Sequence, residues 1–300
     1  MSSKPVTLTL GPLLFHWPAE TLRDFYFRIA DEAPVDHVCV GEVVCSRRQP
    51  LFQHVLADVV ERLERGGKTV MFSSLALPTL DREVLMGADL ATGEHMVEAN
   101  DVSVLRSLAQ RPHAVGPFLN VYNEATAAFL ASRGATRITL PPELPQNSIG
   151  AIAAATPNVD VEVWSFGRMP LAISARCYHA RLNGRTKDAC QFACNQDADG
   201  LEVETVDNQD FLAVNGVQTL SHTYCALLGE ISRLQELGVS ALRLSPHTYD
   251  MVAVAHLFRS VITGERDPGA AMSELQALCS DAMFSNGYFH ADVGAAYVSA

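Results

Sequence analysis

HVCVGEVVCSRRQPLFQHVLADVVERLERGGKTVMFSSL, residues 37–75, decides the fold because it contains one complete strand–helix–strand unit. His37–Gly41 is apolar and β-branched, which favours a buried strand. Leu51–Arg65 carries apolar residues at helical spacing and stops at the pair Gly66-Gly67, a helix-end signal. Thr69–Leu75 is again strand-like. A helix between two buried strands indicates that the strands run parallel.

The same alternation continues along most of the chain. We expect strands at Val6–Leu10, His37–Gly41, Thr69–Leu75, His95–Ala99, Ala114–Asn120, Arg137–Leu140, Val159–Phe166 and Ala241–Leu244. We expect helices at Ala19–Glu32, Leu51–Arg65, Asp81–Leu90, Val102–Gln110, Glu124–Arg133, Ser148–Ala155, Ala226–Leu237 and Met251–Ile262. The pattern predicts an α/β fold, a TIM-barrel-like (β/α)8 structure, with an open doubly wound sheet as the alternative. The glycine-rich motifs of dinucleotide and P-loop sites do not occur, so neither site has support.

The regular alternation breaks between about residues 169 and 221, after the seventh expected strand. This stretch contains three cysteines and several charges, and a small hairpin is expected around Phe211–Leu220. We interpret it as a cysteine-bearing insertion into one barrel-like domain that spans residues 1–300.

Composition narrows the class of protein. The formal net charge is −12 over 300 residues, which argues against sequence-independent nucleic-acid binding. No apolar run reaches the roughly 18–20 residues of a membrane-spanning helix, and the N-terminus lacks the pattern of a signal peptide. We therefore expect a cytoplasmic protein without a transmembrane segment. Seven cysteines, an odd number, do not suggest a disulfide framework.

Four cysteines are candidates for a metal centre: Cys45, Cys177, Cys190 and Cys194. Cys45 follows the second expected strand and Cys177 follows the seventh, which places both at the carboxyl end of a parallel barrel. A helical turn over residues 188–195 would put the last two sulfurs on one face. Four thiolates suit an iron–sulfur cluster or zinc, and the spacing leaves both open.

Neighbouring charges strengthen the metal hypothesis. Cationic groups favour the thiolate form and offset the negative charge of a cluster. The basic residues that flank the four cysteines are Arg47, Arg48, Arg176, Arg181, Arg185 and Lys187. The other three, Cys39, Cys225 and Cys279, lie within or near strands and helices and are expected to be buried structural residues.

Further polar residues are expected near the carboxyl ends of strands. The carboxylates there are Glu42, Glu98, Asp101 and Glu143. They could perform acid–base chemistry or bind a divalent ion, although each alone is typical of a helix cap or an ion pair. Asn120, Tyr122 and Asn123 follow the fifth strand and could bind a polar substrate, with an Asx turn as the alternative.

Histidines give no clear catalytic arrangement. His179 lies two residues beyond Cys177 and could hydrogen-bond a cluster or lie in solvent. His16 and His247 have no protease-like partners in the sequence, so the catalytic residues stay unassigned.

Longer motifs resemble a known family. Gly41-Glu42-x-x-Cys45-Ser46-x-Arg48, Leu119-Asn120-x-Tyr122-Asn123 and Ser174-Ala175-Arg176-Cys177 are similar to peptidase family U32. Within it, the chain most resembles the UbiV subfamily of anaerobic ubiquinone biosynthesis. Lys187-Asp188-x-Cys190-x3-Cys194 and Arg243-Leu244-Ser245-Pro246 extend the likeness over nearly the whole chain.

The resemblance implies a specific function. It implies a [4Fe–4S] cluster on Cys45, Cys177, Cys190 and Cys194, and a heterodimer with a UbiU-like U32 protein. With a lipid-binding UbiT-like accessory protein, such a pair supports O2-independent hydroxylation of the aromatic ring, with prephenate as the proposed hydroxyl donor. Peptidase activity is not expected of this branch. Possible substrate-binding residues are Glu42, Asn120, Tyr122 and Asn123.

Other classes of function stay open. They are a U32-type peptidase, a structural zinc or scaffold protein, and the related branch that hydroxylates RNA bases. Phe118, Arg168 and His222 depart from the family pattern, which leaves details of substrate and partner open.

Overall fold

Eight parallel strands form a closed barrel in the structure, a computed structural model that describes residues 5–108 and 110–299. The barrel strands are β1 (Thr7–Leu10), β2 (His37–Val40), β3 (Thr69–Ser73), β4 (Met96–Ala99), β5 (His113–Val115), β6 (Ala135–Leu140), β7 (Asp160–Ile173) and β11 (Ala241–Leu244). Each pairs in parallel with the next, and β11 pairs with both β7 and β1, which closes the ring. The predicted TIM-barrel-like fold is therefore confirmed, and the open sheet is excluded.

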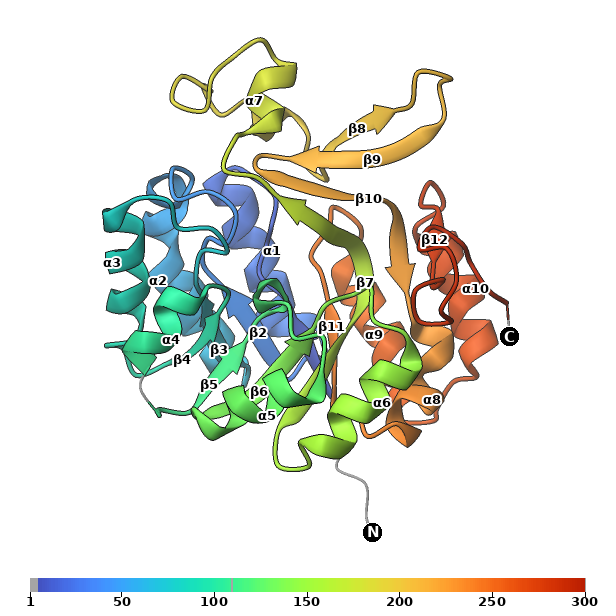
Figure 1. Cartoon of the computed structure of the whole chain (residues 1–300). Coiled ribbons are helices and arrows are strands. Elements are labelled where there is room, and N and C mark those ends of the chain that lie inside the picture. Colours follow the sequence, from blue (N-terminus) through green and yellow to red (C-terminus); the bar gives the residue numbers. More distant parts are fainter. Residues whose placement is uncertain (1–4, 109, 300) are drawn as a thin grey trace.

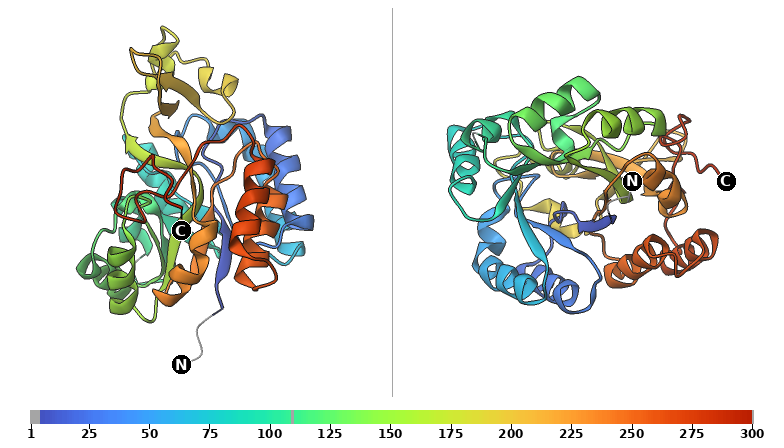
Figure 2. Two further views of the ribbon diagram at one scale, coloured as in Figure 1. Left: turned by 90° about the vertical axis from the view of Figure 1, so that its right-hand side faces the viewer. Right: turned by 90° about the horizontal axis from the view of Figure 1, so that it is seen from below.

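Helices surround the ring, as the view along its axis shows (Figure 2). They are α1 (Ala19–Glu32), α2 (Gln49–Arg65), α3 (Asp81–Leu90), α4 (Val102–Leu108), α5 (Glu124–Ser132), α6 (Gln146–Ala155), α8 (Ile231–Glu236), α9 (Met251–Ile262) and α10 (Pro268–Leu278). The bounds of α1, α3 and α9 are those expected from the apolar spacing. In α1, Leu22, Tyr26 and Ile29 lie on one face and are buried, as the helical period requires. No helix among the described residues is long and apolar enough to cross a bilayer.

The expected fifth strand and the helix expected at Ala226–Leu237 differ from the structure, because proline and non-local pairing overrule local propensity. The fifth strand ends at Val115, since Pro117 lacks an N–H and begins the 3-10 turn η1 (Pro117–Leu119). The helix expected at Ala226–Leu237 is wrong at its start. Ala226 still pairs with Phe166 in the sheet, and the 3-10 turn η3 (Leu228–Glu230) precedes α8. The end expected for the fourth helix falls partly outside the described residues.

β7 is longer than expected and leaves the barrel. Its second half pairs antiparallel with β10 (Gln218–Ala226), which pairs antiparallel with β9 (Asp210–Asn215), and β9 pairs antiparallel with β8 (Leu201–Glu204). The two-residue strand β12 (Phe284–Ser285) pairs in parallel with the second half of β10. The hairpin expected around 211–220 is confirmed as β9–β10. The irregular segment begins at residue 174 rather than 169, because β10 keeps β7 extended to Ile173. Figure 1 shows β8, β9 and α7 (Tyr178–Leu182) above the carboxyl end of the barrel.

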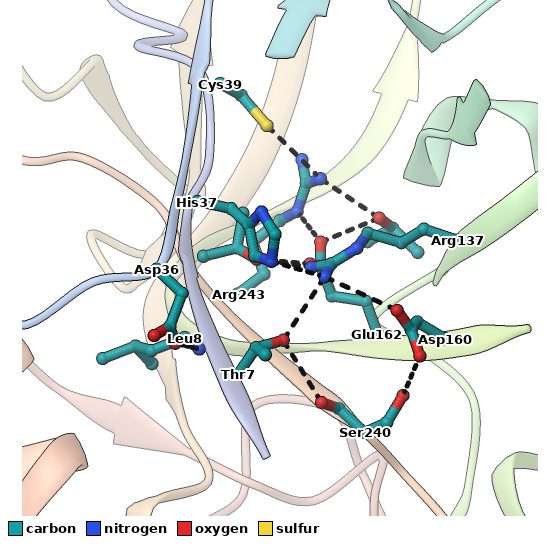
Figure 3. Close-up of polar contacts among 12 residues, drawn as sticks. Thr7, Leu8, Asp36, His37, Cys39, Arg137, Asp160, Glu162, Ser240 and Arg243 are labelled. Carbon is teal, nitrogen blue, oxygen red and sulfur yellow. Dashed lines mark hydrogen bonds and ion pairs between the residues drawn. The ribbon is translucent and has the colours of Figure 1, made fainter. Parts of the chain in front are cut away.

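A buried ion-pair network fills the barrel interior (Figure 3). Arg243 donates to Glu162 at 2.6 Å and to Glu98, while Arg137 donates to Glu162 at 2.8 Å. Thr9 and Thr139 donate to the same Glu162 carboxylate at 2.6 and 2.9 Å. Two guanidinium groups thus face two carboxylates in a space closed to solvent. Glu98, one of the candidate site carboxylates, is therefore a partner within the core.

Replacement of Arg243 by Met tests how much this network stabilises the fold. The change leaves two buried carboxylates short of a cation, so the free energy of unfolding should fall by about 3–5 kcal/mol. Arg62→Met is the control, because Arg62 pairs with Asp31 on the surface and should cost no more than about 1 kcal/mol. Urea denaturation measures both, and equal losses would contradict this role for Arg243.

The same network predicts a pH dependence. Burial acts to raise the pKa of Glu162, but Arg243 and Arg137 hold it well below its ordinary value of 4.5. A lowered folded-state pKa gives stability that is present above pH 4.5 and lost as the pH falls further. Arg243→Met should show a smaller loss of stability in acid than the unsubstituted chain.

Candidate metal centre

The four candidate cysteines line one small pocket, here called the cysteine pocket. Cys45 lies in the turn after β2, and Cys177 precedes α7. Cys190 lies in the following loop, and Cys194 in the 3-10 turn η2 (Ala193–Gln196). All four are free thiols. The barrel end and the β7 extension thus bring together side chains that lie up to 149 residues apart in sequence.

The expected helical turn over residues 188–195 is wrong. Gln191 and Phe192 have left-handed backbones, with φ of 50° and 52°, and only residues 193–196 form a 3-10 turn. Phe192 is held by tertiary contacts, because its ring meets the His16 ring at 5.6 Å and the Arg47 guanidinium at 5.9 Å. Cys190 and Cys194 reach the same pocket through this reversed turn and not through a shared helix face.

Hydrogen bonds reach three of the sulfurs. The backbone N–H of Ala180 donates to Cys177 Sγ and that of Phe192 to Cys190 Sγ, each at 3.4 Å. His16 Nδ1 lies 3.6 Å from Cys194 Sγ. Burial and the nearby Arg48 lower the pKa of His16 to about 4, so this imidazole is neutral at pH 7. Hydrogen bonds of this kind stabilise thiolate ligands and tune a metal centre.

Arg48 is the buried cation of the site. Its side chain is 1% exposed and lines the cysteine pocket. It donates to Leu14 O at 2.9 Å and to Asn215 Oδ1 at 2.8 Å. Burial acts against its charge, but the Glu42 carboxylate and the Cys194 and Cys45 thiols raise its pKa. A permanent positive charge at this position favours thiolates.

The other basic residues divide between the pocket and the surface. Lys187 lines the pocket, and its carbonyl accepts a hydrogen bond of 2.5 Å from Arg47, which ties the Cys45 turn to the insertion. Arg185 donates to Cys190 O at 3.1 Å. Arg176 and Arg181 are exposed.

Glu42 shapes the Cys45 turn. Its Oε1 accepts hydrogen bonds from the N–H groups of Val44 and Cys45, at 2.8 and 2.9 Å. Burial raises the pKa of Glu42, although Arg48 and these hydrogen bonds oppose that effect. Because both contacts are internal to the turn, the structure gives this proposed substrate-binding residue a positioning role.

The donor set suits a four-iron cluster. Among the described residues, no three His, Cys, Asp or Glu side chains converge closely enough to hold a single metal ion. A four-iron cluster makes a different demand, since each thiolate binds its own iron atom. Burial raises the pKa of Cys45 and of Cys177, and a bound metal would reverse this by stabilising the thiolates. The backbone donors to sulfur and the buried Arg48 fit such a group.

A second cavity, here called the mouth pocket, lies at the carboxyl end of the barrel. It has a volume of about 290 Å³ and contains two of the expected substrate-binding residues, Asn120 and Tyr122. Its lining residues are Ala76, Leu77, Pro117, Phe118, Asn120, Tyr122, Pro141, Pro142, Glu143, Pro170, Leu171, Ala172 and Ile173. Asn123 is outside it, since its Oδ1 accepts from Thr126 N at 2.9 Å and caps α5. The Asx-turn alternative therefore applies to Asn123.

The remaining candidates have structural partners. Asp101 Oδ1 accepts from Ser103 N at 2.8 Å at the start of α4. His179 lines the cysteine pocket, but its Nε2 lies 2.9 Å from Asp197 Oδ2. His247 is buried between Asp199 and the backbone N–H of Arg168. Cys39, Cys225 and Cys279 are buried in the core, as expected.

No pattern in the sequence indicated the groove of about 720 Å³ that lies between α2 and α3. Phe72 of β3, Met86 and Leu90 supply apolar lining, and Arg47 and Arg82 are basic lining residues. Outward-facing residues of a barrel strand are expected to be covered by helices, so Phe72 looks in sequence like any other buried strand residue.

Comparisons with known proteins give one family. The sequence model of peptidase family U32 matches residues 20–298. Among solved structures, the chain is similar to the spore cortex-lytic enzyme SleL of Bacillus megaterium QM B1551, with 10% sequence identity. The match covers 81% of this chain and 71% of that one, with a TM-score of 0.27. A likeness of that size supports no conclusion about function.

Replacement of Gly216 by Ala tests the packing of Arg48. Gly216 has φ +64°, and an added Cβ would lie 2.8 Å from Arg48 Nη2, which its hydrogen bonds hold in place. Gly184→Ala is a matched control, since its φ is +66° and nothing lies within 4 Å. Both variants should lose about 1–2 kcal/mol of unfolding free energy from backbone strain. Gly216→Ala should lose measurably more unfolding free energy than Gly184→Ala, as measured by urea denaturation. Equal losses would contradict the fixed position of the Arg48 side chain.

Proposed function

Because the chain belongs to peptidase family U32, we propose that it is a [4Fe–4S] protein of the family's UbiV subfamily, required for O2-independent hydroxylation of the aromatic ring in ubiquinone biosynthesis. The family match alone does not distinguish this branch from others. The motifs around Cys45, Cys177, Cys190 and Cys194 are the sequence features that favour it.

One observation carries the proposal. Four free thiols from separate segments line a single pocket, and backbone N–H groups point at two of the sulfurs. Structural cysteines in a core do not need such donors, whereas cluster ligands use them to set orientation and potential. Cys39, Cys225 and Cys279 provide the contrast, because they are dispersed through the core.

The residues around the pocket would each contribute to such a centre. Arg48 and Lys187 offset the negative charge of four thiolates, and Glu42 fixes the turn that presents Cys45. Phe192 and Ala193 add apolar lining to the pocket. A bound cluster would supply one-electron transfer or a Lewis-acidic iron at the carboxyl end of the barrel.

We propose that the protein acts in the cytoplasm as a heterodimer with a UbiU-like U32 protein. A lipid-binding UbiT-like protein would assist the pair, and prephenate would be the hydroxyl donor. Their basis is the sequence resemblance. The exposed apolar side chains of Leu80, Val84 and Leu85 at α3 are suited to contact with a protein partner.

Replacement of Cys177 by Ala tests the function. Protein purified without air should contain about four irons and four acid-labile sulfides per chain, and the variant should lose most of both. In anaerobically grown cells that lack their own copy, the unsubstituted chain should restore ubiquinone and Cys177→Ala should not. Lipid extraction and chromatography measure the quinone.

Cys225→Ala is the matched control, because Cys225 is a buried core thiol outside the pocket. It should keep its iron and restore ubiquinone. Zinc without sulfide in the purified protein would favour the scaffold alternative. Ubiquinone synthesis that survives loss of Cys177, Cys190 and Cys194 together would contradict the proposal.

A further inference from the structure

A basic surface surrounds the cysteine pocket on a chain that is otherwise acidic. Residues 174–196 contain four basic side chains and one acidic side chain, Asp188, whereas the whole chain has a formal net charge of −12. The basic residues are Arg176, Arg181, Arg185 and Lys187. Arg47 adds a cation from the turn after β2, where its Nη1 lies 3.8 Å from Asp188 Oδ1. A local excess of one charge attracts partners of the opposite charge to that place.

Two of these cations are free to contact another molecule. Arg176 and Arg181 are exposed, and neither guanidinium has a hydrogen-bond or ion-pair partner among the described residues. Arg185 and Lys187 differ, because they donate to the carbonyls of Cys190 and Ala175 at 3.1 and 3.3 Å. The two free guanidinium groups can therefore bind carboxylates of a partner without breaking a contact inside the chain.

The carboxylates of neighbouring segments do not neutralise this surface. Asp197 lies 2.9 Å from His179, and Asp199 lies 3.2 Å from His247. Both are engaged within the molecule, and their side chains are only 26% and 18% exposed. Residues 204–210, at the tip of the β8–β9 hairpin, carry three further carboxylates. Figure 1 shows that this tip extends away from α7.

Exposed apolar side chains lie among the free cations. Tyr178 and Leu182 of α7 are 44% and 58% exposed, and α7 stands at the outer edge of the molecule in Figure 1. An apolar centre with a charged rim is the usual composition of a protein–protein contact. α7 begins directly after Cys177, whose Sγ accepts a hydrogen bond from Ala180 N at 3.4 Å. A helix rises 1.5 Å per residue, so the Cα atoms of Cys177 and Leu182 lie within roughly 10 Å.

We propose that Arg176, Tyr178, Arg181 and Leu182, here called the α7 surface, dock an acidic one-electron carrier protein. The inference rests on the proposed function for the presence of a cluster, and it goes further by identifying the kind of protein that reduces it. One electron leaves the reduced carrier and enters the cluster, while no bond forms or breaks and no proton moves. Because Cys177 directly precedes α7, a carrier docked there lies beside a cluster ligand.

The composition of the α7 surface favours a protein over other polyanions. A nucleic acid gains its affinity from many cations that contact phosphates at once, and an anionic membrane needs roughly four or more. The α7 surface offers two free guanidinium groups. The charge of −12 also repels an extended polyanion from the rest of the chain. A compact acidic carrier contacts α7 alone, and salt screens it from the other acidic surfaces.

Binding of a plant-type [2Fe–2S] ferredoxin, an acidic carrier protein, tests the proposal on the full chain prepared without air. Titration calorimetry at low ionic strength should show binding that weakens as salt is added, because salt screens exposed charges. Charge reversal at both free cations, Arg176→Glu with Arg181→Glu, should weaken ferredoxin binding at least tenfold, since each attraction becomes a repulsion. Leu182→Ser should also weaken it, but without changing the salt dependence.

The matched control is Arg106→Glu with Arg133→Glu, which changes the net charge by the same amount. Both arginines are exposed, one in α4 and one at the end of α5, and Figure 1 shows these helices apart from α7. Because salt screens distant charges, the control should bind ferredoxin within about twofold of the unsubstituted chain.

Two results would overturn the inference. The first is equal weakening by the two double variants, because net charge and not the α7 surface would then determine the affinity. The second is tighter binding of another occupant through Arg176 and Arg181. The occupants to compare are a short single-stranded RNA, phosphatidylserine vesicles and a second copy of the chain.

Iron and sulfide content separates this inference from the proposed function. A chain with its full iron that does not bind ferredoxin contradicts the α7 surface alone. A chain that binds ferredoxin through Arg176 and Arg181 but acquires no iron contradicts the cluster alone. In stopped-flow measurements on the iron-loaded chain, the two charge reversals should slow reduction by reduced ferredoxin at least tenfold. Excess dithionite should reduce the variant and the unsubstituted chain to the same extent.

Discussion

The buried guanidinium of Arg48 joins the parts of the chain on which the candidate centre depends. It donates to Leu14 after β1 and to Asn215 at the end of β9, and it follows Cys45 in the turn after β2. A buried charge is costly unless it is paired and hydrogen-bonded. Here the Glu42 carboxylate supplies the opposite charge. The β9–β10 hairpin can approach because Gly216 has no Cβ to meet Arg48.

The barrel supports the fold, and the extension of β7 carries residues of the candidate sites. In the interior, Arg137, Arg243, Glu98 and Glu162 neutralise one another, which leaves a packed support and not a channel. β7 continues past the barrel and carries one wall of the mouth pocket before the chain reaches Cys177. The same strand therefore links the stable core, the mouth pocket and the cysteine pocket.

Much of this architecture could be predicted from the sequence, because local signals determine it. Apolar spacing gave α1, α3 and α9 at their observed bounds, and the strand–helix alternation predicted the barrel. The rest depends on contacts between distant residues. The length of β7 is set by pairing with β10, more than 40 residues later. The turn that presents Cys190 and Cys194 depends on Phe192 against His16. α10 was missed although Asp267 and Pro268 are a cap and a first-turn proline.

The candidate site likewise combines features that local sequence signals predict with features that depend on contacts between distant residues. The four cysteines were identified by residue type and by the family resemblance, and Cys45 and Cys177 also by their positions after strands. The structure places all four around one pocket. The roles of Glu42 and Glu143 were not separable in sequence, since both are acidic residues after a strand. Only the fold shows that Glu42 accepts hydrogen bonds from its own turn, while Glu143 accepts from the Tyr122 hydroxyl and lines the mouth pocket.

Native mass spectrometry of protein prepared and sprayed without air tests the central claim most directly. It weighs the bound group on the intact chain and distinguishes its metal. We predict a mass increase of about 350 Da, the sum of four irons and four sulfides. An increase of about 65 Da, that of one zinc ion, or a chain that carries no added mass would contradict the assignment of a [4Fe–4S] cluster to the cysteine pocket.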